Sequence, residues 1–229
     1  MRDGRLNFGI IGAGKVGPVF AAALAGAGHH LVGINAAGEA ARDRVEAMLP
    51  RAPFREIDDI VRSSDLVIFA IPGSELPKLV AGLTETNTWR AGQIIAHTAP
   101  EHGYSVFTAA LAQGVIPLAL HPALVFTGTS IDVSRLHGAT IAVTAPTTVL
   151  PIGQALAVEM GAEPVVIADE DRPAYAEALD AAHQFSKAVV LQAKDALREI
   201  GVTDPHLVVG AVVRSAVEEA LGAPPPQDG

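Results

Sequence analysis

The feature that most constrains this chain is a glycine-rich turn close to its N-terminus. The motif Gly12-Ala13-Gly14-Lys15-Val16-Gly17 directly follows the apolar run Leu6–Ile11 and opens a helical pattern. In this setting the first glycine permits a tight turn, the second lets the backbone approach a diphosphate, and the third lets helix and strand pack closely. The backbone amides at the helix start, including those of Lys15 and Val16, are then free to hold phosphate oxygens. The motif predicts a dinucleotide-binding turn, and a purely structural glycine turn is the alternative.

Beyond this turn, short apolar runs alternate with helical patterns. We expect strands at residues 6–11, 30–35, 51–56, 66–71, 92–98, 115–120, 139–143 and 163–168, and helices at 15–27, 38–49, 57–63, 75–83, 104–113 and 149–160. Apolar strands separated by helices indicate a parallel sheet covered on both faces, and right-handed crossovers make it doubly wound.

Two long helical patterns, at residues 175–200 and 206–221, follow the last expected strand. The sequence therefore predicts an α/β fold with a doubly wound, mostly parallel sheet over residues 1–168. A small all-helical domain is expected over residues 169–222, and a disordered tail over 223–229.

Composition narrows the classes of function. The formal net charge is −9 and there is no cysteine, which excludes thiolate catalysis and disulfide scaffolds. No basic run suggests nucleic-acid binding, no apolar stretch approaches the ~20 residues that span a bilayer, and no signal peptide is visible. No metal-binding motif accompanies the histidines. We expect a cytoplasmic protein with a small-molecule substrate and neither a nucleic-acid nor a membrane partner.

The end of the second expected strand bears on the choice of cofactor. NAD sites place an acidic residue there to bond the ribose hydroxyls, but this chain has the neutral Asn35. A neutral side chain does not repel a 2′-phosphate, and Arg42 or Arg44 could reach one. We therefore expect NADP, with NAD possible, although both arginines also suit the solvated face of a short helix.

Other candidate residues lie where later strands end, because ligands of open α/β sheets bind at that edge. Ile71-Pro72 would border the ribose or nicotinamide, and His97-Thr98 and His121 follow at the next two strand ends. A histidine there can orient a substrate or donate a proton near neutral pH. The alternative is that each histidine caps its strand end through backbone hydrogen bonds.

The first long helix carries His183, Gln184 and Lys187 in an otherwise apolar stretch. His183 and Lys187 are four residues apart and share one face, which could supply a general acid to a cleft or simply face water. Both long helices carry apolar residues on several faces, which requires burial by their own domain or by a partner. Since they are too short to form a core alone, we expect a homodimer built on them.

Four stretches carry a resemblance to a known family: FGIIGAGKVG at residues 8–17, IIAHTAPEHG at 94–103, LALHPALVFTG at 118–128 and DEDRPAYAEALDAA at 169–182. They resemble bacterial Rossmann-like proteins described as NADP-dependent oxidoreductases with a C-terminal helical domain of unknown function. Relatives of that family are ketopantoate reductase, pyrroline-5-carboxylate reductase and the 6-phosphogluconate-dehydrogenase-like superfamily.

The resemblance implies a dehydrogenase or reductase that acts on a small 2-oxo or 2-hydroxy acid such as ketopantoate. His121 and His97 would orient or protonate the substrate, and Gln184 and Lys187 are further catalytic candidates. The chain departs from the family at His183-Gln184, where the family has a Ser-Asn pair, and in lacking the family's final segment. A non-catalytic dinucleotide-binding sensor or a scaffold is the alternative function.

Overall fold

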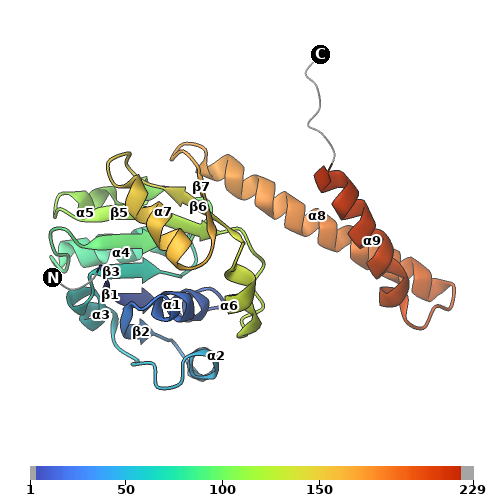
Figure 1. Ribbon diagram of the computed structural model, residues 1–229, viewed down its shortest axis with the longest axis horizontal. Coiled ribbons are helices and arrows are strands. Elements are labelled where there is room, and N and C mark those ends of the chain that lie inside the picture. Colours follow the sequence, from blue (N-terminus) through green and yellow to red (C-terminus); the bar gives the residue numbers. More distant parts are fainter. Residues whose placement is uncertain (1–3, 223–229) are drawn as a thin grey trace, which may run out of the picture. The chain divides into compact units, whose positions relative to one another are not determined.

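Figure 1 shows the computed structural model of the protein, which describes residues 4–222. The chain divides into two compact units, Met1–Ala176 and Glu177–Gly229. The predicted domain boundary at residue 168 falls a few residues before this division, because the first long helix begins inside the first unit. The predicted tail, residues 223–229, lies outside the described residues.

The first unit is built on a seven-stranded sheet with the strand order β2-β1-β3-β4-β5-β6-β7. Its strands are β1 (Asn7–Ile11), β2 (His30–Asn35), β3 (Leu66–Phe69), β4 (Ile94–His97), β5 (Ile116–Pro122), β6 (Thr140–Thr144) and β7 (Glu163–Val166). All neighbouring strands are parallel except β5 and β6. The order reverses at β1, with β2 on one side and β3 on the other, so the crevice at the carboxyl ends of β1 and β3 is the switch point where such sheets bind ligands.

Helices cover both faces of this sheet (Figure 1). One core joins it to α1 (Gly17–Gly26), α6 (Ile131–Leu136) and α7 (Leu150–Glu159), and the other to α3 (Ile57–Ser63), α4 (Leu76–Glu85), the 3₁₀ turn η1 (Tyr104–Phe107) and α5 (Thr108–Leu111). The strands alternate accordingly: Leu66 and Ile68 of β3 enter the first core, and Val67 and Phe69 the second. The predicted doubly wound fold is confirmed.

The structure differs from the sequence-based expectations in four local features. The predicted strand 51–56 is reduced to a single parallel bridge between Ile34 and Phe54, since Pro53 has no N–H to continue a ladder. The predicted helix 104–113 is divided into η1 and α5, and α6 was not predicted. After β5 the chain turns back, which makes β6 antiparallel to β5.

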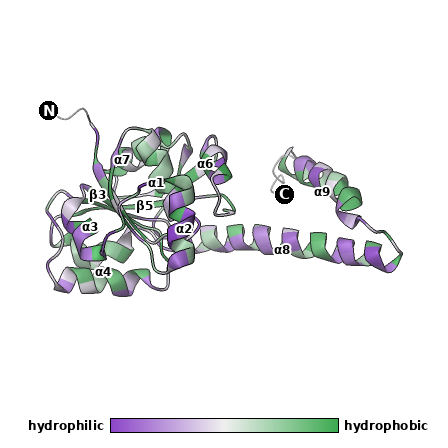
Figure 2. Ribbon diagram, turned by 90° about the horizontal axis from the view of Figure 1, so that it is seen from below, coloured by the Kyte–Doolittle hydropathy of each residue, from purple (hydrophilic) through white to green (hydrophobic). Residues whose placement is uncertain are grey.

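The remaining helices are α2 (Glu39–Met48), which follows β2, and α8 (Arg172–Glu199) and α9 (Pro205–Gly222), which form most of the second unit. Large apolar side chains on α8 and α9 are exposed, among them Phe185 (72%), Val212 (68%) and Leu221 (82%), and Figure 2 shows apolar positions along both helices. An apolar groove of about 340 Å³ lies between them. No helix within residues 4–222 combines the length and the hydropathy that a membrane crossing requires.

Candidate functional site

The glycine turn connects β1 to α1 at the switch point of the sheet. Gly12 has a φ of +104°, and a Cβ placed on it would lie 2.4 Å from the carbonyl oxygen of Ala70. A Cβ on Gly17 would lie 2.0 Å from the carbonyl oxygen of Gly12. At Gly14, by contrast, a Cβ would meet no atom within 4 Å, and φ is not in the left-handed region. Packing therefore requires glycine at positions 12 and 17 but not at position 14.

The backbone amides of this turn are available to a ligand. Within residues 4–222, none of the N–H groups from Ala13 to Gly17 donates a hydrogen bond, and Val16 at the start of α1 provides no side-chain cap. Unpaired amides at a helix N-terminus, where the helix dipole is positive, favour an anion. Lys15 is an exposed residue of the same turn. The turn thus has the geometry that diphosphate binding requires.

A second loop lies against the glycine turn. A Cβ on Gly128 would lie 3.1 Å from Cγ of Lys15 and 3.2 Å from Nε of Arg44. Arg44 donates from Nη1 to the carbonyl oxygen of Ala13 at 2.9 Å. Arg44 therefore stabilises the glycine turn itself. Its observed contacts are not at the end of β2, where a 2′-phosphate was expected.

The fully buried Asp132 holds the loop that contains Gly128. Its Oδ2 accepts hydrogen bonds from the amides of Thr127 and Gly128, both at 2.8 Å, and Oδ1 accepts one from Arg135 at 3.0 Å. Burial alone would raise the pKa of this carboxyl, but these hydrogen bonds hold the pKa below its ordinary value.

Two pockets are lined by adjacent residues of the chain, residues 54–56 in one and Ile57 with Asp58 in the other. The polar one, of about 530 Å³, is lined by Asn35, Ala36, Arg42, Phe54, Arg55, Glu56, Asp59 and Ser63. Within it the Arg42 guanidinium lies 4.9 Å from the centre of the Phe54 ring, and Asn35 donates to the carbonyl oxygen of Arg55.

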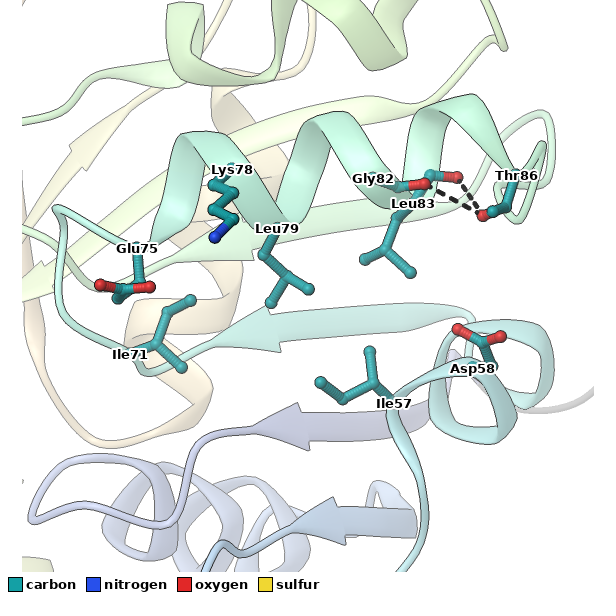
Figure 3. Close-up of a pocket in the computed structure, with 9 residues that line it drawn as sticks. All are labelled: Ile57, Asp58, Ile71, Glu75, Lys78, Leu79, Gly82, Leu83 and Thr86. Atoms are coloured by element: carbon teal, nitrogen blue, oxygen red, sulfur yellow. Dashed lines mark hydrogen bonds between the residues drawn. The ribbon is translucent and has the colours of Figure 1, made fainter.

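The second pocket is an apolar groove of about 480 Å³ between α3 and α4. Figure 3 shows Ile57, Leu79 and Leu83 facing its interior, with Glu75 and Lys78 toward the end near Ile71. Ile71 also approaches the glycine turn, since a Cβ on Gly12 would lie 2.8 Å from its Cγ2. The groove therefore begins beside the switch point.

His97, at the end of β4, is almost fully buried and bonded on both ring nitrogens. Nδ1 accepts the amide of Ala99 at 3.2 Å, so Nε2 carries the proton and donates to the carbonyl oxygen of Gly103 at 3.0 Å. Burial, followed by the nearby positive charge of Arg172, lowers the pKa of His97 to about 3. These contacts match the alternative interpretation, in which His97 caps the end of its strand through backbone hydrogen bonds. A catalytic role of His97 stays a prediction.

The buried neutral His97 should make the protein sensitive to acid. Its folded pKa of about 3 lies below the unfolded value of about 6.5, so protons favour the unfolded state and stability falls as pH drops below 6.5. At pH 4.5 this difference amounts to about 2–3 kcal/mol. We expect His97→Gln to have a lower free energy of unfolding than the wild type at pH 7. Between pH 7 and pH 4.5, the free energy of unfolding should fall by about 2–3 kcal/mol less in the variant than in the wild type. Urea unfolding at both pH values measures this, and parallel losses in the two proteins would contradict it.

The loop after β4 is tied to the loop after β3. His102 contacts the carbonyl oxygen of Gly73 through Nε2 at 3.0 Å, and the Glu101 carboxylate occupies the space that a Cβ on Gly73 would need. The amide of Thr98 donates to the carbonyl oxygen of Phe69 at 3.1 Å, whereas Pro72 is exposed at the edge. The predicted residues Pro72 and Thr98 therefore lie on adjoining loops at the switch-point edge.

His121 lies at the same edge and contacts Tyr175, which was not among the predicted site residues. Its Nδ1 is 2.8 Å from the Tyr175 hydroxyl, and the two rings meet edge to face. Burial, followed by the charge of Arg172, lowers the pKa of His121 to about 4, so this imidazole is neutral at pH 7.

Arg172 is a fully buried cation beside this pair. It donates from Nε to Thr144 Oγ1 at 2.7 Å, and from Nη2 to the carbonyl oxygens of Ala119 and Ala142. Nη1 has no partner within residues 4–222, and no described carboxylate lies within 4 Å of the guanidinium. Burial lowers the pKa of Arg172 to about 10, which leaves it charged at pH 7.

Sequence reasoning missed Arg172 and Tyr175 because both precede the apolar part of a long helix, where polar residues normally face solvent. The available signal was Arg172-Pro173, a cationic residue and a proline at a helix start, six residues after the end of the last strand.

The three polar candidates of the long helix lie in the second unit. His183, Gln184 and Lys187 are all exposed, and Gln184 donates to Asp180 at 3.3 Å on the same helix. Their catalytic role stays a prediction.

The fold is similar to the folds of several solved oxidoreductase structures. A provisionally assigned NADP oxidoreductase from Bacteroides fragilis shares 17% identity, with 98% of this chain and 85% of that one covered and a TM-score of 0.76. A 1-pyrroline-5-carboxylate reductase from Streptococcus pyogenes shares 18% identity, with coverage of 97% and 82% and a TM-score of 0.70. A Plasmodium falciparum pyrroline carboxylate reductase, solved with NADP bound, shares 10%, with coverage of 96% and 80% and a TM-score of 0.65.

No curated protein sequence matches this chain. Family models match in two parts: residues 1–122 match the Rossmann-like domain, and residues 139–228 match a domain of unknown function, DUF2520. The predicted combination of a Rossmann-like domain with a C-terminal domain of unknown function is confirmed. The chain belongs to the Rossmann-like domain family.

Proposed function

We propose that this protein is an NAD(P)-dependent oxidoreductase that reduces a small 2-oxo acid. The observation that carries the proposal is Gly14, a glycine that packing does not require, in a turn whose amides are unpaired. An approaching diphosphate explains why a side chain is absent there. The similarity of fold to NADP oxidoreductases and pyrroline-carboxylate reductases supports the same cofactor class.

The two pockets beside the turn suit the adenosine half of such a cofactor. The apolar groove that begins at Ile71 would take the flat adenine ring, and Arg42 with Asn35 in the polar pocket would take a 2′-phosphate. Arg42 lies against the Phe54 ring, which fixes its charge at this position. We therefore propose NADP as the preferred cofactor.

The other end of the dinucleotide would extend past Pro72 and Thr98 toward β5. When bound there, the reduced nicotinamide would supply a hydride to the substrate carbon. The positive charge of Arg172 is desolvated and contacts no carboxylate of residues 4–222, which favours a substrate that carries a carboxylate next to its carbonyl group. This is the reason for proposing a 2-oxo acid.

Titration with reduced cofactors tests the proposal. We expect NADPH to bind the wild-type protein, and Arg42→Ala to raise its Kd at least tenfold while changing the Kd of NADH less than twofold, because only NADPH carries the 2′-phosphate. Nicotinamide fluorescence measures both constants, and Arg5→Ala, at the opposite edge of the sheet, is the matched control. A flat signal with both cofactors would exclude the function, and equal losses for both would exclude the preference for NADP. Turnover with pyruvate, 2-oxobutyrate or ketopantoate separates an enzyme from a sensor.

We also propose that a second copy of the chain covers the apolar residues of α8 and α9. Side chains such as Phe185 and Val212 are too exposed for a protomer that remains alone in water. Light scattering should give twice the 23.6 kDa of one chain. Phe185→Glu should then give single chains, since a carboxylate is costly to bury, and a wild-type mass of one chain would contradict the proposal.

A further inference from the structure

Tyr175 and His121 come from different elements and meet at the sheet edge. His97 pairs with Ala119 across β4 and β5, and His121 follows two residues later, so its side chain leaves the same face of the sheet about 7 Å further along. β5 lies three strand spacings, about 14 Å, from β1 and its glycine turn. The Tyr175–His121 pair therefore lies on the side of the proposed cofactor site where the nicotinamide would bind. Both residues are only half-buried, so a ligand can reach them.

The charges around the pair suit a phenol that gives up its proton. The Arg172 guanidinium lies 5.6 Å from the centre of the Tyr175 ring, and the charge of Asp169 also acts on Arg172. Burial raises the pKa of Tyr175, so its hydroxyl is protonated at pH 7, while the Arg172 charge favours the phenolate once it forms. His121 is neutral at that pH and is not the acid.

We propose that the Tyr175 hydroxyl is the proton donor in the reduction, and that His121 is the positioning residue that restores its proton. This inference rests on the proposed function. The bound reduced nicotinamide would supply a hydride to the carbonyl carbon of the substrate, and the carbonyl oxygen would take the proton from the Tyr175 hydroxyl. The Tyr175 phenolate then takes the proton on Nδ1 of His121 as Nε2 of His121 takes a proton from a solvent water molecule. The imidazole therefore stays neutral, and the hydroxide that remains is neutralised by the solvent buffer.

The chain offers a matched control, because it contains only two tyrosines. The other one, Tyr104 in η1, makes no side-chain hydrogen bond within residues 4–222. We expect Tyr175→Phe to lower kcat for a 2-oxo acid by about 10²–10⁴-fold, with the KM and the Kd of NADPH changed less than threefold. Tyr104→Phe should keep kcat within twofold. Wild-type kcat in Tyr175→Phe would overturn the proposal.

A second measurement needs no substrate. In Tyr104→Phe protein the only phenol is Tyr175, so ultraviolet absorbance of the phenolate reports its titration alone. Saturation with NADP⁺ should lower the midpoint of this titration, because the positive nicotinamide ring would lie near the hydroxyl. The added change His121→Gln should also shift it, because the hydrogen-bond partner is altered.

The two measurements separate the levels of the argument. If neither NADPH nor NADP⁺ binds the wild-type protein, the proposed function is wrong, regardless of how Tyr175 titrates. If both cofactors bind but the Tyr175 titration responds neither to NADP⁺ nor to His121→Gln, the proposed cofactor site stands and the role of Tyr175 is overturned. Circular dichroism over the titration range confirms that each variant remains folded.

Discussion

Gly14→Ala is expected to keep the stability of the wild-type protein and to weaken NADPH binding at least tenfold. The new methyl group would meet no protein atom within 4 Å and would not strain the backbone, so the folded state loses nothing. In the complex the same methyl group would occupy the space through which the backbone approaches the diphosphate. Thermal unfolding and NADPH fluorescence titration measure the two effects separately.

Two other glycines of α1 supply the controls. Gly26→Ala, at the far end of the helix, also places a methyl group in open space and should change neither stability nor NADPH affinity by much. Gly17→Ala would push a methyl group to 2.0 Å from a backbone oxygen, which should cost about 3–5 kcal/mol and abolish cofactor binding through loss of the fold. An unaltered NADPH affinity in Gly14→Ala would remove the main support for a diphosphate at this turn.

Most of the sheet was predictable because its central strands, β3 and β4, are buried on both faces and form uninterrupted apolar runs in the sequence. β2 and α3 match the predicted bounds, and β1, β3 and β4 differ by one or two residues at their ends. The wrongly predicted segment 51–56 has no β-branched residue and contains Pro53. Its residues therefore do not favour a strand. The connection before the antiparallel strand β6 contains α6, a six-residue helix too short to leave a clear periodic pattern in the sequence.

The glycine turn was predictable because the residues that form it are adjacent in the sequence. The cluster around His121 was not, because Tyr175 lies 54 residues away and Arg172 bonds to carbonyl groups up to 53 residues away. Those contacts exist only after β5 and β6 have paired. Sequence reasoning also assigned His121 the part of a proton donor from its ordinary pKa, whereas burial and Arg172 keep it neutral.

Arg172→Met is expected to leave the stability of the first unit unchanged or to raise it, by at most about 3 kcal/mol. The pKa of this guanidinium falls from its ordinary 12.5 to about 10, and at about 1.4 kcal/mol per pKa unit its charged form costs roughly 3 kcal/mol in the folded protein. Methionine has a similar length and carries no charge to desolvate. Thr144 keeps its own hydrogen bond to the carbonyl oxygen of Ile167.

Function should move in the opposite direction. Without the positive charge, kcat/KM for 2-oxo acids should fall at least a hundredfold, and the pKa of His121 should rise above its value of about 4, because Arg172 is one of the two causes that lower it. Urea unfolding, steady-state kinetics and the imidazole titration by NMR measure the three quantities. Arg5→Met, which removes an exposed arginine 3.6 Å from Glu159, should change none of them appreciably.

The opposite signs distinguish a functional cation from a structural one. If Arg172 serves to join β5, β6 and the start of α8 through its three hydrogen bonds, the methionine variant should lose more than about 2 kcal/mol. If Arg172 serves the reaction, its burial with no contacting carboxylate among the described residues lowers the stability of the fold but keeps a positive charge at the site. An unpaired Nη1 in a fully buried side chain is consistent with the second case, since a purely structural arginine gains from pairing every donor.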